Sequence, residues 1–301
     1  MKNLFSFSLA AGLLFAALAA HAQSQASCSF SLYRLSSSQN DVTEPFGVND
    51  FTNSVGQLTT EPSPGTFVRR GFIHFSSGAV SLFTAPHSTA TSFNDRNNAG
   101  TMVGSYFDTN TNKEQGFVLH NGTFVTVSHP NAPRGTELRR INKNGVIVGS
   151  WFDSSGFNHG FKLVSGTFSS IHFPNSNATS PQGVNDNGAI VGWYTLPVSG
   201  SSGVLQGFTL VNGTYHTLNV LGGSGTELRG ISNAGTIVGL SGSTEAGVSF
   251  LRKSSGAVEL ISVPNSFATE VTGISLVNGI ITGRAFFNSD GTWHAFTAKC
   301  Q

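Results

Sequence analysis

The chain has 301 residues, of which only 10% are charged, and its formal net charge at neutral pH is +1. No run of Lys and Arg is present, which argues against a surface that follows the phosphates of a nucleic acid. The 25 Phe residues favour a packed core over disorder, and the 36 Gly residues favour short strands joined by tight turns.

Residues 1–22 have the features of a secretory signal peptide. Lys2 supplies a positive start, an apolar run from Leu4 to Ala20 follows, and Ala20-His21-Ala22 fits the small-residue cleavage pattern. The apolar run is short for a membrane span, and no later stretch is long enough to be one; a retained anchor helix is the alternative. We expect a mature chain over residues 23–301 that is secreted or periplasmic, has no membrane span and is a monomer.

Two short motifs recur along the mature chain with a period of about 45 residues. The first is a Val-Gly step, which becomes Thr-Gly in the last copy: Val55-Gly56, Val103-Gly104, Val148-Gly149, Val191-Gly192, Val238-Gly239 and Thr282-Gly283. The second is a small residue before Phe: Gly71-Phe72, Gly116-Phe117, Gly160-Phe161, Gly207-Phe208, Ser249-Phe250 and Ala295-Phe296. Both series contain six copies, so the sequence predicts six repeats.

Each repeat has the pattern of four short strands. In the fourth repeat, Thr179 to Asn185 is the first strand, and an Asn-Gly turn leads to a second strand from Ala189 to Tyr194. The third strand carries the small-residue–Phe motif, and the fourth ends near a proline, which suits a sheet edge. Four strands at this period are typical of a β-propeller blade. We therefore expect an all-β, six-bladed β-propeller formed by a single domain, residues 23–301; a pair of β-sandwiches is the alternative.

The sixth repeat ends before its fourth strand. Phe30 and Tyr33 have the spacing of fourth-strand residues, so we expect residues 28–36 to complete the last blade and close the ring. In this register Cys28 and Cys300 occupy the place of a hairpin turn, which predicts a disulfide, with two free thiols as the alternative. Closing a loop of this length stabilises the fold by roughly 5 kcal/mol in the chain-entropy model. Two cysteines without histidines at ligand spacing argue against zinc.

Segments 158–161 and 293–296, Asn-His-Gly-Phe and Trp-His-Ala-Phe, resemble the signature of the HAF-repeat family of predicted bacterial extracellular repeat proteins. Segments 142–149 and 185–192 are similar to the second recurring block of that family. Other residues replace the signature His in four repeats, at Arg70, Gln115, Gln206 and Val248. The resemblance implies an exported repeat protein and brings no catalytic residues with it.

A threonine opens the first strand of every repeat, and a glutamate follows it in four repeats, at Glu44, Glu137, Glu227 and Glu270. Two of these glutamates have an arginine two residues later, at Arg139 and Arg229. If the first strands line a channel, these six residues surround its mouth. The carboxylates can then hold calcium through oxygen ligands or hydrogen-bond a polyol. The structural alternative is that Glu137 and Arg139, on one face of a strand, pair with each other or with a neighbouring blade.

His159 and His294 share one repeat position and can share a metal only if both reach the axis; otherwise they are separate polar residues. The sequence contains no hydrolase, zinc-peptidase, phosphate-loop or dinucleotide signature, so no catalytic or metal-binding residue is predicted. We expect a non-enzymatic binding or scaffold protein whose partner is a saccharide or another envelope component, not a nucleic acid. The alternative function is a polysaccharide hydrolase or lyase with its site at the channel mouth.

Overall fold

The computed structural model describes residues 24–197, 203–222, 225–242 and 247–301, and these residues form strands joined by turns, with no helix. The all-β expectation is therefore confirmed for the described residues. The predicted signal peptide, residues 1–22, lies outside them. Within the described ranges no helix could span a membrane.

Antiparallel hydrogen bonding joins the described strands in groups of four that follow the sequence repeats. The first three groups are β3 (Val42–Val48), β4 (Ser54–Ser63), β5 (Thr66–His74) and β6 (Val80–Phe83); β7 (Ser88–Arg96), β8 (Met102–Asp108), β9 (Lys113–His120) and β10 (Thr123–Val127); and β11 (Gly135–Ile141), β12 (Ile147–Phe152), β13 (Asn158–Val164) and β14 (Thr167–Ile171). The next two are β15 (Ala178–Val184), β16 (Ile190–Thr195), β17 (Leu205–Val211) and β18 (Thr214–Thr217); and β19 (Thr226–Ile231), β20 (Ile237–Ser241), β21 (Val248–Arg252) and β22 (Val258–Leu260). The last is β23 (Ala268–Ile274), β24 (Ile280–Phe287) and β25 (Thr292–Cys300), to which β2 (Cys28–Tyr33) is added.

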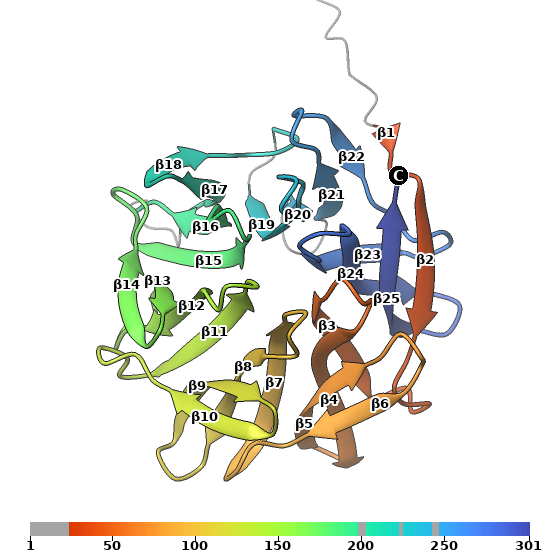
Figure 1. Ribbon diagram of the computed structural model, residues 1–301. Helices are drawn as coiled ribbons and strands as arrows, with labels where there is room; N and C mark the ends of the chain where they lie inside the picture. Colours follow the sequence, from red (N-terminus) through yellow and green to blue (C-terminus); the bar gives the residue numbers. More distant parts are fainter. Residues whose placement is uncertain (1–23, 198–202, 223–224, 243–246) are drawn as a thin grey trace, which may run out of the picture.

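The groups follow one another around a common centre, and the first strand of each group lies nearest to it (Figure 1). Single parallel bridges, Arg69 to Ala90 and Glu114 to Gly135, join the first three groups into one hydrogen-bonded sheet. The first strands therefore surround a shared central space.

Strands from the beginning and the end of the described residues meet in the last group, where β2 pairs with β25 and Cys28 lies opposite Cys300. A disulfide joins these two cysteines, as the repeat register predicts. Phe30 packs edge-on against Phe296 with ring centroids 5.4 Å apart. A short strand, β1 (Ser24–Gln25), pairs in parallel with β22. A strand of only two residues is too short to show the alternation of apolar and polar residues that predicts a strand, so the sequence analysis did not predict β1.

The two recurring motifs form the core. The motif Phe has no exposed surface in any repeat: Phe72, Phe117, Phe161, Phe208, Phe250 and Phe296. The Val-Gly glycine allows a close approach between the first two strands. A Cβ atom on Gly149 would stand 2.1 Å from the carbonyl oxygen of Glu137, and the equivalent glycines meet the equivalent carbonyls at similar distances. Both motifs therefore recur because each group needs the same packing.

The recurring threonine is also structural. Thr136 is buried, and its hydroxyl accepts a hydrogen bond of 2.9 Å from the backbone N–H of His129 in the preceding connection. The same contact recurs at Thr43, Thr91, Thr179, Thr226 and Thr269. The threonine thus anchors each first strand to the chain before it.

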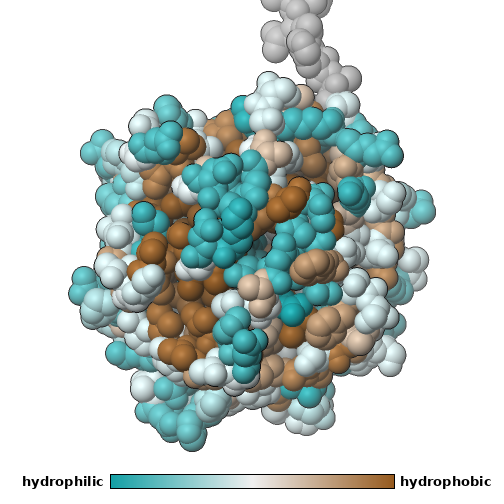
Figure 2. Space-filling view, in the orientation of Figure 1, coloured by the Kyte–Doolittle hydropathy of each residue, from teal (hydrophilic) through white to brown (hydrophobic). Residues whose placement is uncertain are grey.

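Asparagines at the turns after the first strands connect neighbouring groups. The Asn142 side chain donates to the Asn185 carbonyl at 3.0 Å, and the Asn185 side chain donates to the Ser232 carbonyl at 3.0 Å. Asp50 connects the first and last groups, because it accepts the backbone N–H groups of Val277 and Asn278. Hydrophilic residues cover the centre of the face on which these turns lie (Figure 2).

Candidate functional site

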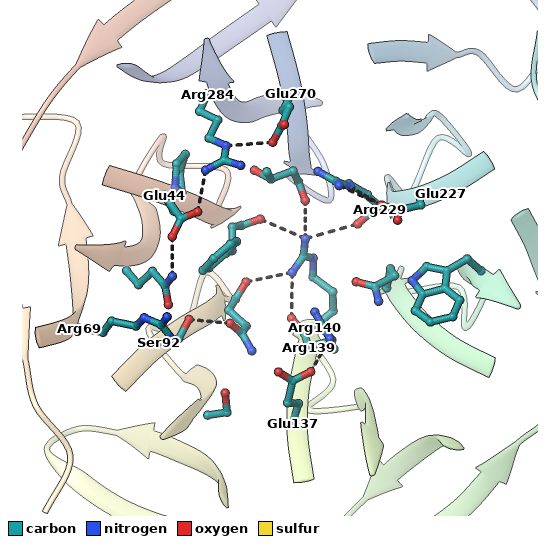
Figure 3. Close-up of a pocket in the computed structure, with 18 of the residues that line it drawn as sticks. Glu44, Arg69, Ser92, Glu137, Arg139, Arg140, Glu227, Arg229, Glu270 and Arg284 are labelled. Carbon is teal, nitrogen blue, oxygen red and sulfur yellow. Dashed lines mark hydrogen bonds and ion pairs between the residues drawn. The ribbon is translucent and has the colours of Figure 1, made fainter. Parts of the chain in front are cut away.

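A cavity of about 540 Å³ occupies the centre of the strands, and we call it the central pocket. All six residues predicted from the repeats line it: Glu44, Glu137, Glu227, Glu270, Arg139 and Arg229. Side chains from several groups point toward one another there (Figure 3). The structure therefore brings together residues that are spread over more than two hundred positions of the sequence.

The pocket also contains charged and aromatic residues that the sequence analysis missed: Arg69, Glu114, Arg140, Arg284 and Trp193. Arg284 and Trp193 each follow the Val-Gly or Thr-Gly step of their repeat. That position pairs across the first two strands with the glutamate position, as Glu270 pairs with Arg284. The pairing could have been inferred from the strand register. The amino acid at this position differs between repeats, however, so the position does not stand out as a recurring motif in the sequence.

All four predicted glutamates are held in ion pairs. Glu227 accepts two hydrogen bonds from Arg229, at 3.0 and 2.9 Å. Arg284 connects two groups, because it lies 2.9 Å from Glu270 and 2.6 Å from Glu44. Glu137 contacts Arg139 on its own strand, as the structural alternative predicts.

These ion pairs give the calcium option no support. A guanidinium and a hard cation such as calcium need the same carboxylate oxygens. A carboxylate that already pairs with a guanidinium is therefore a poor calcium ligand. In the parts of the chain that the structure describes, no three His, Cys, Asp or Glu side chains are grouped so as to hold a metal.

Arg140 forms the floor of the pocket (Figure 3). Each first strand has a β-bulge at one equivalent residue, where the register shifts and a carbonyl turns out of the ladder. The Arg140 guanidinium donates five hydrogen bonds of 2.6 to 3.3 Å to such carbonyls, those of Phe46, Asn94, Arg139, Arg229 and Thr272. A second cavity of about 60 Å³ is also lined by Arg140, so this side chain separates the two cavities.

Asp95 occupies the repeat position of Arg140 in the second repeat. Its carboxylate accepts the backbone N–H of Ile141 at 3.0 Å. Burial raises the pKa of Asp95, and the positive charge of Arg140 opposes that rise. The other repeats have glycine here: Gly47, Gly183, Gly230 and Gly273. A Cβ on Gly273 would stand 2.6 Å from the Phe46 carbonyl oxygen. The crowded centre therefore has little room for further side chains at this position.

Glu114 is the acidic residue of the pocket with the most unusual environment. Its Oε1 accepts a hydrogen bond of 2.6 Å from the Ser105 hydroxyl. Burial and the neighbouring charge of Glu137 raise the pKa of Glu114, while Arg139 and Arg69 oppose the rise. A carboxyl group with a raised pKa inside a cavity is a candidate proton donor.

Two polar atoms beside Glu114 lack a hydrogen-bond partner within the described residues. They are Oε2 of Glu137, which contacts the Arg139 guanidinium only as an ion pair, and Nε of Arg139. Buried polar atoms are normally hydrogen-bonded, so these two atoms mark a part of the pocket wall whose polar groups are incompletely paired.

The two histidines lie apart from each other, each with its own partner. His159 Nε2 is 2.9 Å from Asp153, and His294 Nε2 is 2.7 Å from Asp290. Each aspartate belongs to the turn that precedes the strand of its histidine. Neither histidine lines the central pocket. The interpretation as separate polar residues is therefore confirmed.

No protein-family model and no curated protein matches this sequence. Several solved structures share the fold. A virginiamycin B lyase from Staphylococcus aureus has a TM-score of 0.51 and 12% identity, over 91% of this chain and 99% of the lyase. The β-propeller domain of the Trilobed protease from Pyrococcus furiosus has a TM-score of 0.52 and 9% identity, over 86% and 96% of the two chains. TolB from Acinetobacter baumannii has a TM-score of 0.53 and 12% identity, over 83% and 65%.

These similarities establish the class of the protein as a β-propeller. At 9 to 12% identity they show the fold alone.

Proposed function

We propose that the protein is an exported six-bladed β-propeller, completed by β2, that binds a saccharide in the central pocket without converting it. The observation that carries this proposal is the pocket itself, a cavity of about 540 Å³ in which carboxylates, guanidiniums and an indole surround a floor formed by Arg140. This volume lies within the usual range of small-molecule sites.

Several observations support the architecture and the export. The strand groups follow the repeats of the sequence, and β2 pairs with β25 across the chain ends. A Cys28–Cys300 disulfide is typical of proteins from oxidising compartments outside the cytoplasm. The resemblance to the HAF-repeat family is also consistent with an exported repeat protein.

The chemistry of the lining favours a sugar over a free metal ion. Carboxylates accept hydrogen bonds and guanidiniums donate several in one plane, so together they match neighbouring hydroxyl groups of a saccharide. Trp193 offers an aromatic face with a polar edge against which the C–H face of a sugar ring can pack. Because five glutamates balance five arginines in the lining, the pocket has no excess negative charge to attract a cation.

The test is calorimetric titration and thermal unfolding of residues 23–301 with a panel of neutral and acidic oligosaccharides. We expect at least one to bind and to raise the melting temperature, and Trp193→Ala and Glu137→Gln to weaken that binding. Glu259→Gln is the matched control, since Glu259 pairs with Lys253 outside the pocket. Absence of binding across the panel, or binding that both pocket variants leave unchanged, contradicts the proposal.

One observation favours the alternative function, a polysaccharide hydrolase or lyase. Glu114 and Glu137 are neighbouring carboxyl groups, and the charge of Glu137 helps to raise the pKa of Glu114. A protonated and an ionised carboxyl group in one pocket are the usual requirement for general acid–base catalysis. Release of reducing ends or unsaturated sugars from polysaccharides, abolished by Glu114→Gln, would support catalysis. No product from any polysaccharide that binds would exclude it.

A further inference from the structure

The two halves of the central pocket differ in how completely their charged side chains are paired. Around β19, β23 and β24 the charges are mutually satisfied, because Arg229 is held by Glu227 and Arg284 lies between Glu270 and Glu44. The Arg140 guanidinium likewise already donates its hydrogen bonds to backbone carbonyls. A ligand that bound to these groups would first have to break existing ion pairs.

The other half, formed by β5, β9 and β11, has unused hydrogen-bonding capacity. Arg69 lines the pocket from β5, and its side chain is exposed. Of the five arginines in the lining, it alone makes no side-chain hydrogen bond or ion pair within the described residues, and no dashed line reaches it in Figure 3. The unpartnered Nε of Arg139 lies in the same half.

The charge of this half is positive when Glu114 holds its proton. Arg69 and Arg139 each contribute one positive charge, and Glu137 contributes one negative charge that Arg139 pairs with. Glu114 is the other acidic residue of this half. Its burial raises its pKa, which favours the neutral form. The nearby lining residues Ser92 and Ser105 are uncharged. Whatever the charge of Glu114, Arg69 is the guanidinium of this half that no carboxylate pairs with among the described residues.

We propose that Arg69 is the anchor for the carboxylate of an acidic saccharide, so that the ligand of the central pocket is a uronate-containing oligosaccharide. This inference rests on the proposed saccharide-binding function and narrows its ligand class. A guanidinium binds a carboxylate through two parallel hydrogen bonds, which provides both strength and orientation. With its carboxylate at Arg69, the sugar places its hydroxyl groups toward Arg139 and Glu137, which line the same part of the pocket.

The experiment compares tetragalacturonate with its fully methyl-esterified form, which has the same sugar chain without the negative charges. We expect tetragalacturonate to bind at least about tenfold more tightly by calorimetry, since a hydrogen-bonded charge pair contributes more than a neutral one. The preference should shrink at high salt because the site is exposed. Arg69→Gln should abolish the preference and leave the affinity for the ester unchanged.

Arg70→Gln is the matched control, because Arg70 is the adjacent residue of β5 and does not line the pocket. It removes the same charge and should retain the preference. Equal affinity for the acid and its ester, or a preference that persists in Arg69→Gln, overturns the inference while saccharide binding stands. Equally tight binding of tetraglutamate overturns the assignment to a sugar. Failure of every saccharide to bind overturns the proposed function as well.

Discussion

Arg140 donates a hydrogen bond of 2.6 Å to the backbone carbonyl of Thr272, which lies 132 residues further along the chain. The same guanidinium bonds to the carbonyl of Phe46, 94 residues away in the other direction. One side chain therefore connects first strands from both ends of the sequence at the floor of the central pocket. Burial lowers the pKa of Arg140 and the charge of Asp95 opposes that fall, but a guanidinium starts from so high a value that it stays protonated in the physiological pH range.

Arg140→Met should destabilise the protein strongly. The substitution leaves five carbonyl oxygens without their donor and removes the positive charge beside Asp95. We expect a loss of about 3 kcal/mol in the free energy of unfolding, measured by urea titration. Arg139→Met is the control, since Arg139 has one ion-pair partner on its own strand. A similar loss for both variants would contradict the central role of Arg140.

Loss of the disulfide should destabilise the joined chain ends. Cys28 and Cys300 are separated by 272 positions, so their bond restricts a very large loop of the unfolded chain. Replacing both with serine should lower the free energy of unfolding by roughly 2–5 kcal/mol. A reducing agent should lower the melting temperature of the wild type and leave the double variant unchanged. An unchanged wild-type melting temperature after confirmed reduction would refute this expectation.

Gly149→Ala tests the close approach of the first two strands. The added methyl group would stand 2.1 Å from the Glu137 carbonyl oxygen, so β11 must shift and carry Glu137 away from its place in the pocket. We expect a destabilisation of about 3 kcal/mol or more in thermal unfolding, together with weaker ligand binding. Gly122→Ala is the control, since that turn glycine has open space around it and only its positive φ opposes alanine, at about 1 kcal/mol. Equal effects of the two substitutions would exclude the proposed crowding.

Glu114→Gln should change how stability depends on pH. The folded-state pKa of Glu114 lies above its ordinary value of 4.5, so the folded protein holds this proton more tightly than the unfolded chain does. Its contribution is most favourable below pH 4.5 and is lost as the pH rises through the folded-state pKa. The wild type should therefore lose stability relative to Glu114→Gln as the pH rises above 4.5.

The measurement is the free energy of unfolding by urea at several pH values for both proteins. Glu259→Gln serves as the control for removal of one carboxylate outside the pocket. Parallel curves for the wild type and Glu114→Gln over the whole pH range would show that the environment of Glu114 does not favour its proton.

The strand positions could be predicted because every group of strands has the same close packing and therefore needs the same residues at equivalent positions. Gly149 and Phe161 have equivalents in every repeat, since the close strand contact and the buried ring recur. The glutamates of the pocket were found for the same reason. Arg140, Asp95 and Glu114 were missed because each occurs once, at a position where the other repeats have different residues.

The sequence by itself determined the repeats, the all-β architecture and the pairing of Cys28 with Cys300, because turn chemistry, alternation and register act between near neighbours or recur in every copy. Only the tertiary structure decided which charges meet. Arg284 pairs with Glu44 across 240 positions, and the charge of Arg69 lowers the pKa of Glu114 although Arg69 has no ion pair among the described residues. Such contacts depend on how strands from distant repeats surround one centre, and no local pattern of residues records that geometry.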